Sequence, residues 1–121
     1  MSEERIKIIK SFREKVVKDF LDVLVLKSIK EGSEPTGYKI MKGLSGKLGI
    51  LLSSGTLYSV LRSLERKGLV KSDMKSHKVY SLTPKGERFI NALLSDQTTR
   101  QFLTLLQRPL SEVEKNEKES P

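Results

Sequence analysis

Residues Ser53 to Val70 of this 121-residue chain read SSGTLYSVLRSLERKGLV, and this stretch decides the fold class. On a helix that turns by 100° per residue, its apolar residues fall on one narrow side. They are Leu57, Leu61 and Leu64. An apolar stripe of this width predicts a helix with one side buried in a core.

The same stretch contains its own start and stop signals. Ser53 or Ser54 can accept a hydrogen bond from the free N–H groups that open a helix. Gly68 can adopt the left-handed conformation that closes a helix, after which Leu69 can fold back onto Leu64. We therefore expect a helix over residues 53–67.

The outward side of this helix is small, hydroxylated and cationic. Its centre holds Gly55, Ser59, Arg62 and Arg66, and its flanks hold Tyr58 and Ser63. Such a face suits insertion into a groove of nucleic acid. An ordinary amphipathic surface helix would show the same stripe, so the surrounding sequence has to decide between the two.

Composition narrows the class of protein. A chain of this length forms one domain, with or without appendages. It has no cysteine, which is consistent with a reducing compartment. The first 20 residues lack a continuous apolar core, and the longest apolar run, residues 23–26, is too short to span a bilayer. We expect a soluble, cytoplasmic protein.

The net charge of +8 is concentrated in the middle of the chain. Residues 36–88 contain 11 basic and three acidic side chains, whereas residues 1–35 contain eight and seven. A clustered positive charge is what a polyanion-binding surface needs, because each neutralised phosphate releases counterions. A merely solvated basic surface is the alternative.

The N-terminal region is expected to be helical from residue 1 to about 31, and the pattern allows a break near Phe12. Residues 20–29 are apolar enough for a core helix. The part of the helix before residue 20 has an apolar edge, with Ile9, Phe12 and Val16, that a single small domain does not cover. It predicts contact with a second subunit, and a frayed terminal helix is the alternative.

A helix-turn-helix follows. Gly32, Ser33, Glu34 and Pro35 end the first helix, and Thr36 is an N-cap for the next. That second helix carries Lys39 and Lys42 away from its apolar stripe, where they could hold phosphate. The helix over 53–67 is then the third helix, the usual recognition element.

After Gly68 the apolar period changes from helix to strand. Residues 69–71 and 79–82 predict two short strands, with Tyr80 and Leu82 on one face. The polar stretch 71–78 between them is expected to be a wing, with Lys75 and Lys78 as phosphate contacts. A polar loop with solvated charges is the alternative.

The C-terminal region predicts further helix and a tail. Thr83 and Pro84 restart a helix as N-cap and first residue. Either one helix bends after residue 94, or Ser95 or Asp96 caps a separate last helix. A second group of apolar residues lies beyond the winged-helix core and predicts a dimer interface. They are Phe89, Leu93, Phe102, Leu103 and Leu106. Residues 108–121 are expected to be a disordered charged tail.

Three motifs together resemble the PadR family of winged-helix transcriptional regulators. They are TGYKI at 36–40, SGTLY at 54–58 with LERKGLV at 64–70, and KVYSLT at 78–83 followed by Gly86. The resemblance spans about residues 21–88. It implies a homodimeric, repressor-like DNA-binding protein that dimerises through its terminal helices. It also implies that Tyr38 and Tyr58 lie near the DNA backbone and that the start of the third helix enters the major groove.

Combined with the chemistry of the side chains, the resemblance divides the expected DNA contacts. Ser54, Thr56, Tyr58 and the helix N-terminus are expected to position the helix on phosphates. Ser59, Arg62 and Ser63 are expected to contact bases, and Arg66 the backbone. Ser59 stands where the family often has proline, and His77–Lys78 where it often has Arg–Lys, so His77 could make binding mildly pH dependent.

An enzyme is not expected. The chain has one histidine and no cysteine, and Ser53–Ser54–Gly55 has no partnering base. A metal site is not expected because His77 lacks companions. No cofactor or effector is predicted. The main competitor is a winged helix used as a protein–protein interaction module without specific DNA binding.

The predicted fold class is therefore mainly α with a small β-hairpin, a winged helix-turn-helix with extra terminal helices. Residues 1–20 form an N-terminal extension, 21–88 the DNA-binding domain, 89–107 a dimerisation region and 108–121 the tail. The predicted partners are double-stranded DNA and a second copy of the chain.

Overall fold

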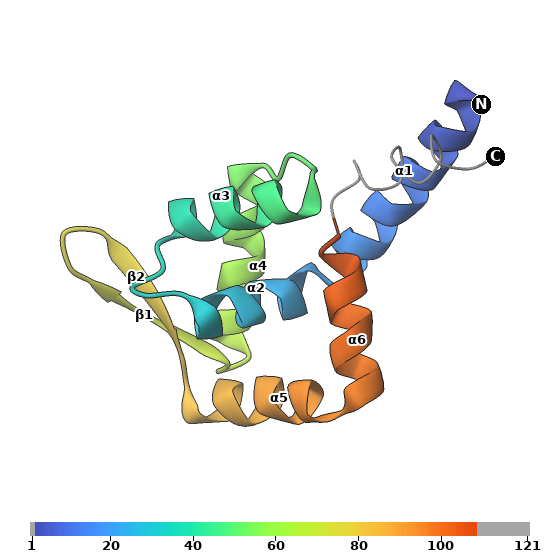
Figure 1. Ribbon diagram of the computed structural model, residues 1–121. Helices are drawn as coiled ribbons and strands as arrows, with labels where there is room; N and C mark the ends of the chain where they lie inside the picture. The colour runs from blue at the N-terminus through green and yellow to red at the C-terminus, as the bar shows by residue number, and fades with distance from the viewer. Residues whose placement is uncertain (1, 109–121) are drawn as a thin grey trace.

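The computed structural model describes residues 2–108, which form helices and one antiparallel hairpin (Figure 1). In chain order the elements are α1 (Glu3–Asp19), α2 (Leu21–Glu31), α3 (Gly37–Leu48), α4 (Ser54–Arg66), β1 (Val70–Met74), β2 (Lys78–Leu82), α5 (Pro84–Ser95) and α6 (Gln97–Leu106). The order helix, helix, helix, hairpin over α2 to β2 confirms the predicted winged-helix class.

Helix α2 is the centre of the core. It packs against α3, α4, α5 and β2, and Figure 1 shows these elements arranged around it. Its buried side chains are Leu21, Leu24, Val25, Leu26 and Ile29. Each contributes about 1.5–3 kcal/mol by leaving water, so this helix orders its neighbours.

The first helical region breaks at Phe20 and not near Phe12, where the sequence pattern allowed a break. Helix α1 runs unbroken through Phe12 to Asp19, and Phe20 has a non-helical ψ of 16°. The break lets α2 turn into the core while the Phe20 ring packs edge-on against Phe102, with 5.4 Å between the ring centroids. Phe20 and Phe102 are 82 residues apart in the chain, so the local pattern of α1 could not show the contact that accompanies this break.

The caps of α3 and α4 form as the sequence predicts. The Thr36 hydroxyl accepts a hydrogen bond from the Lys39 N–H, and the Ser53 hydroxyl accepts one from the Thr56 N–H. At the end of α4, Gly68 has a φ of 74°, and the Leu69 N–H donates to the Leu64 carbonyl. Leu57, Leu61 and Leu64 are buried, so the predicted inner side of the 53–67 helix is confirmed.

The hairpin is longer than expected and has a third partner. Strands β1 and β2 pair from Val70 opposite Leu82 to Met74 opposite Lys78. Only residues 75–77 therefore lie between the strands, not 71–78, because cross-strand pairing extends into the polar residues. The chain before α3 also pairs with β2, through a bridge between Thr36 and Val79.

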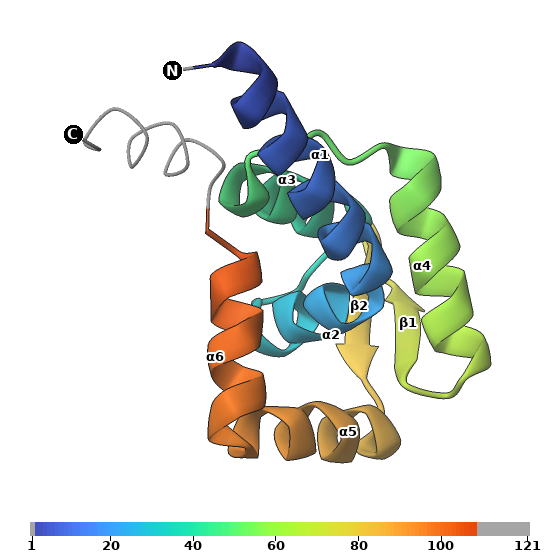
Figure 2. The ribbon, with the colours of Figure 1, turned by 90° about the vertical axis from the view of Figure 1, so that its right-hand side faces the viewer.

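Helices α5 and α6 are separate, so the alternative of a separate last helix is correct and that of one bent helix is not. Asp96 is the N-cap of α6 and accepts a hydrogen bond from the Thr99 N–H. Figure 2 shows α6 turning away from the end of α5, with α4 and α6 on opposite sides of α2. The predicted tail, apart from Arg108, lies outside the described residues.

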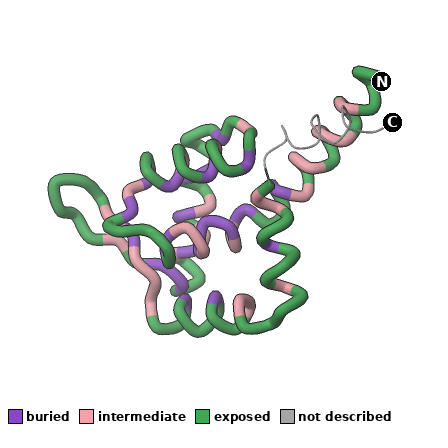
Figure 3. The backbone as a smooth tube through the Cα atoms, in the orientation of Figure 1, coloured by how far each residue is buried: buried purple, intermediate pink, exposed green. Residues whose placement is uncertain are grey.

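Burial follows this arrangement. Figure 3 shows buried residues along α2 and the inner sides of α3 and α4, whereas most of α1 is exposed or half-buried. Within residues 2–108, Val17 is the only buried residue of α1. No helix in this part of the chain is both long enough and apolar enough to cross a bilayer.

Candidate nucleic-acid interface

The outer face of α4 is open to solvent along its length. Gly55, Ser59, Arg62 and Arg66 are exposed, and Ser63 is half-buried. No carboxylate within residues 2–108 forms an ion pair with either arginine. Both guanidinium groups are therefore available for an anionic or carbonyl partner, and their five donors suit phosphates and guanine edges.

The first turn of α4 is arranged as a set of donors. The Ser53 hydroxyl donates to Thr56 Oγ1 over 2.8 Å, so the Thr56 hydroxyl keeps its own proton for another acceptor. Ser54, Gly55 and Thr56 are exposed, and no acidic residue lies in this turn. The positive end of the helix dipole adds to this preference for an anion.

Tyr58 joins α4 to the start of α3. Its ring lies so close to Gly37 that a Cβ on residue 37 would overlap the hydroxyl and lie 2.7 Å from Cζ. The side chain is still 40% exposed, so the phenol lies at the surface beside the N-terminus of α3. The site predicted from the sequence includes Tyr38 but not Gly37, whose role appears only when α3 and α4 are placed together.

The exposed side of α3 carries a second aromatic and several cations. Tyr38 is 62% exposed, and the Lys42 ammonium lies 5.9 Å from its ring centroid. Lys39 and Lys42 are both exposed. A cation over a ring face is held loosely by the ring quadrupole, which keeps Lys42 near the tyrosine while its charge faces solvent.

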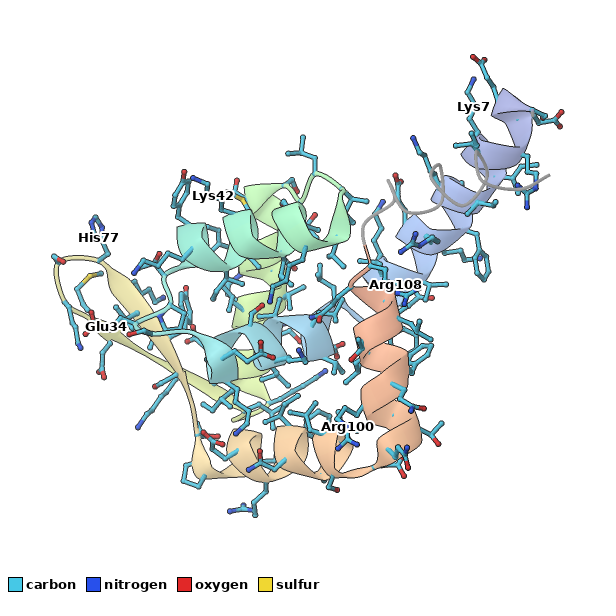
Figure 4. All side chains as sticks on the ribbon, in the orientation of Figure 1. Lys7, Glu34, Lys42, His77, Arg100 and Arg108 are labelled. Atoms are coloured by element: carbon cyan, nitrogen blue, oxygen red, sulfur yellow. The ribbon has the colours of Figure 1, made fainter. Side chains whose placement is uncertain are left out.

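The wing places His77 and Lys78 at the same end of the molecule. Figure 4 shows His77 on the hairpin turn and Lys42 on α3, both far from Lys7 and Arg108. The Lys78 ammonium lies 5.7 Å from the ring centroid of the buried Tyr80. Burial is the main reason that the pKa of Tyr80 is raised, so this phenol stays neutral at physiological pH.

Lys75, the remaining wing residue of the predicted site, is paired. Its ammonium donates to Glu34 Oε1 over 2.8 Å. The site predicted from the sequence assigns Lys75 to a phosphate and does not include Glu34. Nothing in the local sequence signals this pair, because 41 residues separate the two side chains.

One cleft of about 620 Å³ connects these parts. Its walls are Glu34, the start of α3, the wing and Tyr58. From the predicted site it brings together Tyr38, Lys39, Tyr58, Lys75, His77 and Lys78. Ser54, Gly55, Thr56, Ser59, Arg62, Ser63, Arg66 and Lys42 do not line it and lie on the open surfaces of α4 and α3. Cations and hydroxyl groups around one concavity suit a polyanion.

The predicted dimer residues lie at the other end of the molecule and along α5. Phe12 is 66% exposed, Phe89 and Phe102 are each 41% exposed, and Ile9, Val16, Leu93 and Leu106 are half-buried. Leu103 is 3% exposed, so it already packs within its own subunit and has little surface to offer a partner. An apolar groove of about 260 Å³ runs between α1 and α6, lined by Phe12, Val16, Phe102, Leu105 and their neighbours.

No group of three or more histidine, cysteine, aspartate or glutamate side chains within residues 2–108 is placed to hold a metal ion.

Comparison with known families identifies the chain. The sequence profile of the transcriptional regulator PadR-like family matches residues 25–92, more than half of the sequence. The chain belongs to the PadR-like family. Its members are transcriptional regulators and not enzymes, which confirms the family resemblance and the expectation of a non-enzymatic protein. This PadR-like protein is a DNA-binding transcription regulator.

Solved structures support the fold of the PadR-like chain. A PadR family transcriptional regulator from Eggerthella lenta DSM 2243 is 25% identical, with 98% of this chain and 100% of that chain covered and a TM-score of 0.61. A PadR family transcription regulator from Clostridium difficile R20291 is 28% identical, with 72% and 94% covered and a TM-score of 0.54.

A third similar structure is Bacillus subtilis PadR in complex with operator DNA. It is 22% identical, covers 64% of this chain and 48% of that chain, and has a TM-score of 0.53. At this identity the likeness shows the shared fold. A search of curated proteins found no match to this chain.

Proposed function

We propose that this PadR-like protein represses transcription by binding an inverted-repeat operator as a homodimer. Helix α4 lies in the major groove, and the wing contacts the backbone or minor groove. The observation that carries the proposal is the surface shared by α3, α4 and the wing, where exposed cations, tyrosines and hydroxyls meet with little opposing acid. The complex of Bacillus subtilis PadR with operator DNA supports the choice of ligand.

Each predicted contact has a chemical role in this proposal. Tyr38, Lys39, Lys42, Lys75 and Lys78 hold phosphates, together with Ser54, Thr56 and Tyr58 at the start of α4. Arg62, with Ser59 and Ser63, reads base edges, and Arg66 reaches the backbone. Gly55 leaves the helix surface low enough for the backbone to approach a groove. His77 stands beside Lys78 as a further wing contact.

The apolar surface of α1, α5 and α6 supports the homodimer. A dimer that inserts both copies of α4 into successive major grooves has to hold them about 34 Å apart, one turn of B-DNA, and so requires an inverted-repeat site. The repressor role follows from the family resemblance. In this proposal residues 21–88 bind DNA, residues 1–20 and 89–107 dimerise, and the protein acts in the cytoplasm.

Two substitutions test the proposal once a site has been selected from genomic fragments. Arg62→Ala should lose about 1–3 kcal/mol of preference for that site, because a bidentate base contact is removed. Lys78→Ala should weaken binding to all sequences alike and reduce the salt slope by about one, because it removes a phosphate contact. Fluorescence anisotropy at several salt concentrations measures both effects.

Two results would contradict this reading. Unchanged site preference in Arg62→Ala at fixed salt would mean that α4 is oriented differently. Binding of a protein partner, with DNA affinity that barely depends on salt, would favour the protein–protein interaction module instead.

A further inference from the structure

Glu34 has an unusual backbone conformation. Among residues 2–108 it is the only non-glycine residue with a positive φ, 47°. Side chains other than Gly, Asn and Asp are uncommon in this left-handed region because the Cβ crowds the carbonyl oxygen. The neighbouring Gly32 does not take up the strain, since its φ is −84°. The backbone conformation disfavours a glutamate here, so any advantage of this residue has to come from its side chain.

The side chain of Glu34 reaches the wing. Its Oε1 accepts a hydrogen bond from the Lys75 ammonium over 2.8 Å, and the two side chains remain 64% and 57% exposed. The backbone that follows is tied to the same hairpin, because the Tyr80 N–H donates to the Pro35 carbonyl over 2.9 Å. Figure 4 shows Glu34 beside the hairpin. The strand-like segment before α3 thus presents a carboxylate to the wing turn.

The pair stays charged at physiological pH. The hydrogen bond and charge of Lys75 lower the pKa of Glu34, and Glu34 raises the pKa of Lys75 in turn. Lys39 also acts on Glu34, and Asp73 also acts on Lys75, each with a smaller effect. In the described part of the chain, the other wing cations, Lys71 and Lys78, have no carboxylate within ion-pair distance.

We propose that Glu34 is a counter-ion that occupies Lys75 in the free protein and that DNA has to displace. This inference depends on the proposed function, since the proposed function assigns Lys75 to a phosphate in the complex. A phosphate oxygen and the Glu34 carboxylate compete for the same ammonium. Once Lys75 moves to DNA, Glu34 remains beside the phosphates as an unpaired negative charge. Both effects lower the affinity for every sequence alike.

The competition also changes the response to salt. Added salt weakens the interaction of Lys75 with DNA, but it also weakens the interaction of Glu34 with Lys75. The two changes partly cancel, so the wild-type protein depends less on salt than its number of phosphate contacts implies. Removing the Glu34 charge removes this compensation.

The test compares Glu34→Gln with wild type on a fluorescein-labelled DNA duplex of arbitrary sequence, over a series of salt concentrations. Glu34→Gln should bind about two- to fivefold more tightly at low salt, the range of one exposed ion pair. The slope of log K against log salt should steepen by up to about 0.9. Circular dichroism melting establishes that both proteins are folded.

Glu87→Gln is the matched control. It removes the same charge from an exposed ion pair, with Lys30 at 3.2 Å, but lies on α5 rather than beside the wing turn. It should leave DNA affinity nearly unchanged. A gain equal to that of Glu34→Gln would mean that only net charge matters and would overturn the inference.

A double-mutant cycle completes the test. In a Lys75→Gln background, the gain from Glu34→Gln should shrink, because the contested ammonium is gone and only the repulsion between Glu34 and the phosphates remains. A gain that persists in full, or weaker or unchanged binding by Glu34→Gln itself, would overturn the inference and leave the proposed function intact. Absence of DNA binding by the wild-type protein would overturn both.

Discussion

Single side chains determine how the DNA-facing surface is assembled. Tyr58 belongs to α4, yet its ring rests on Gly37 at the start of α3. The contact places a phenol beside the free N–H groups of α3, where both can donate to one phosphate. Glycine is required at 37 because a side chain would occupy the place of the ring, and not because of its backbone angles.

Gly37→Ala should therefore affect binding more than stability. The clash is with the end of a side chain that is 40% exposed and can swing into solvent, so the free energy of unfolding should fall by only about 1 kcal/mol. DNA affinity should fall about tenfold, the effect of one lost charge-assisted hydrogen bond. Anisotropy and urea denaturation measure the two quantities.

Gly43→Ala on the same helix is the control. Nothing lies within 4 Å of its added Cβ, so stability should rise by about 0.5–1 kcal/mol and affinity should stay constant. Equal losses of affinity in both variants would mean that the Tyr58 contact has no special role.

At the scale of elements, the caps decide where helices end and how they turn. Asp96 ends α5 and begins α6, and its carboxylate accepts hydrogen bonds from the Thr99 hydroxyl at 2.7 Å and the Thr99 N–H at 3.0 Å. This cap lies at the turn that brings α6 back against α1. It also makes the geometry of the terminal helices sensitive to acid.

The Asp96 cap predicts a pH dependence of stability. The Thr99 hydroxyl and then its N–H hold the pKa of Asp96 below its ordinary value of 3.8. A group whose pKa is lower in the folded state stabilises the fold above its unfolded pKa, and this contribution is lost as the pH falls. Thermal melts should therefore lose stability below about pH 4 in wild type.

Asp96→Asn should reduce that loss, because asparagine can still cap the helix but does not titrate. Parallel melts of the two proteins between neutral pH and pH 3 provide the comparison. An identical acid-induced loss in the variant would assign the effect to other carboxylates.

Across the whole molecule, the surface expected to bind DNA lies apart from the apolar groove between α1 and α6. Helices α3 and α4 and the wing lie on one side of the molecule, and α1 and α6 lie on the other (Figure 1). Leu105 is 54% exposed beside Phe12 in the groove between these helices. A dimer through this end would leave both DNA-facing surfaces free.

Phe12→Glu should therefore yield a monomer in sedimentation equilibrium, whereas the wild-type protein should sediment as a dimer. A point substitution is preferable to deletion of α6, because Leu103 and Phe102 pack against the core and their removal would expose it. Met74→Glu is the matched control, since Met74 is 76% exposed on the wing. An undiminished dimer in Phe12→Glu would move the interface to Phe89 and Leu93 on α5.

Much of the fold could be read from local sequence. The caps at Thr36, Ser53 and Thr83, the left-handed Gly68 and the buried side of α4 all depend on residues within about one helical turn of each other. The outward face of α4 follows from the same periodicity. For these features, residues close together in the chain are enough to specify both the element and the side it exposes.

Tertiary structure decided the rest, because those features join residues far apart in the chain. The turn at Phe20 accompanies its contact with Phe102, and the length of the wing depends on pairing between β1 and β2. The contact of Tyr58 with Gly37 and the ion pair of Glu34 with Lys75 form only once α3, α4 and the hairpin are packed. Local periodicity carries no information about such contacts, since their partners are chosen by packing.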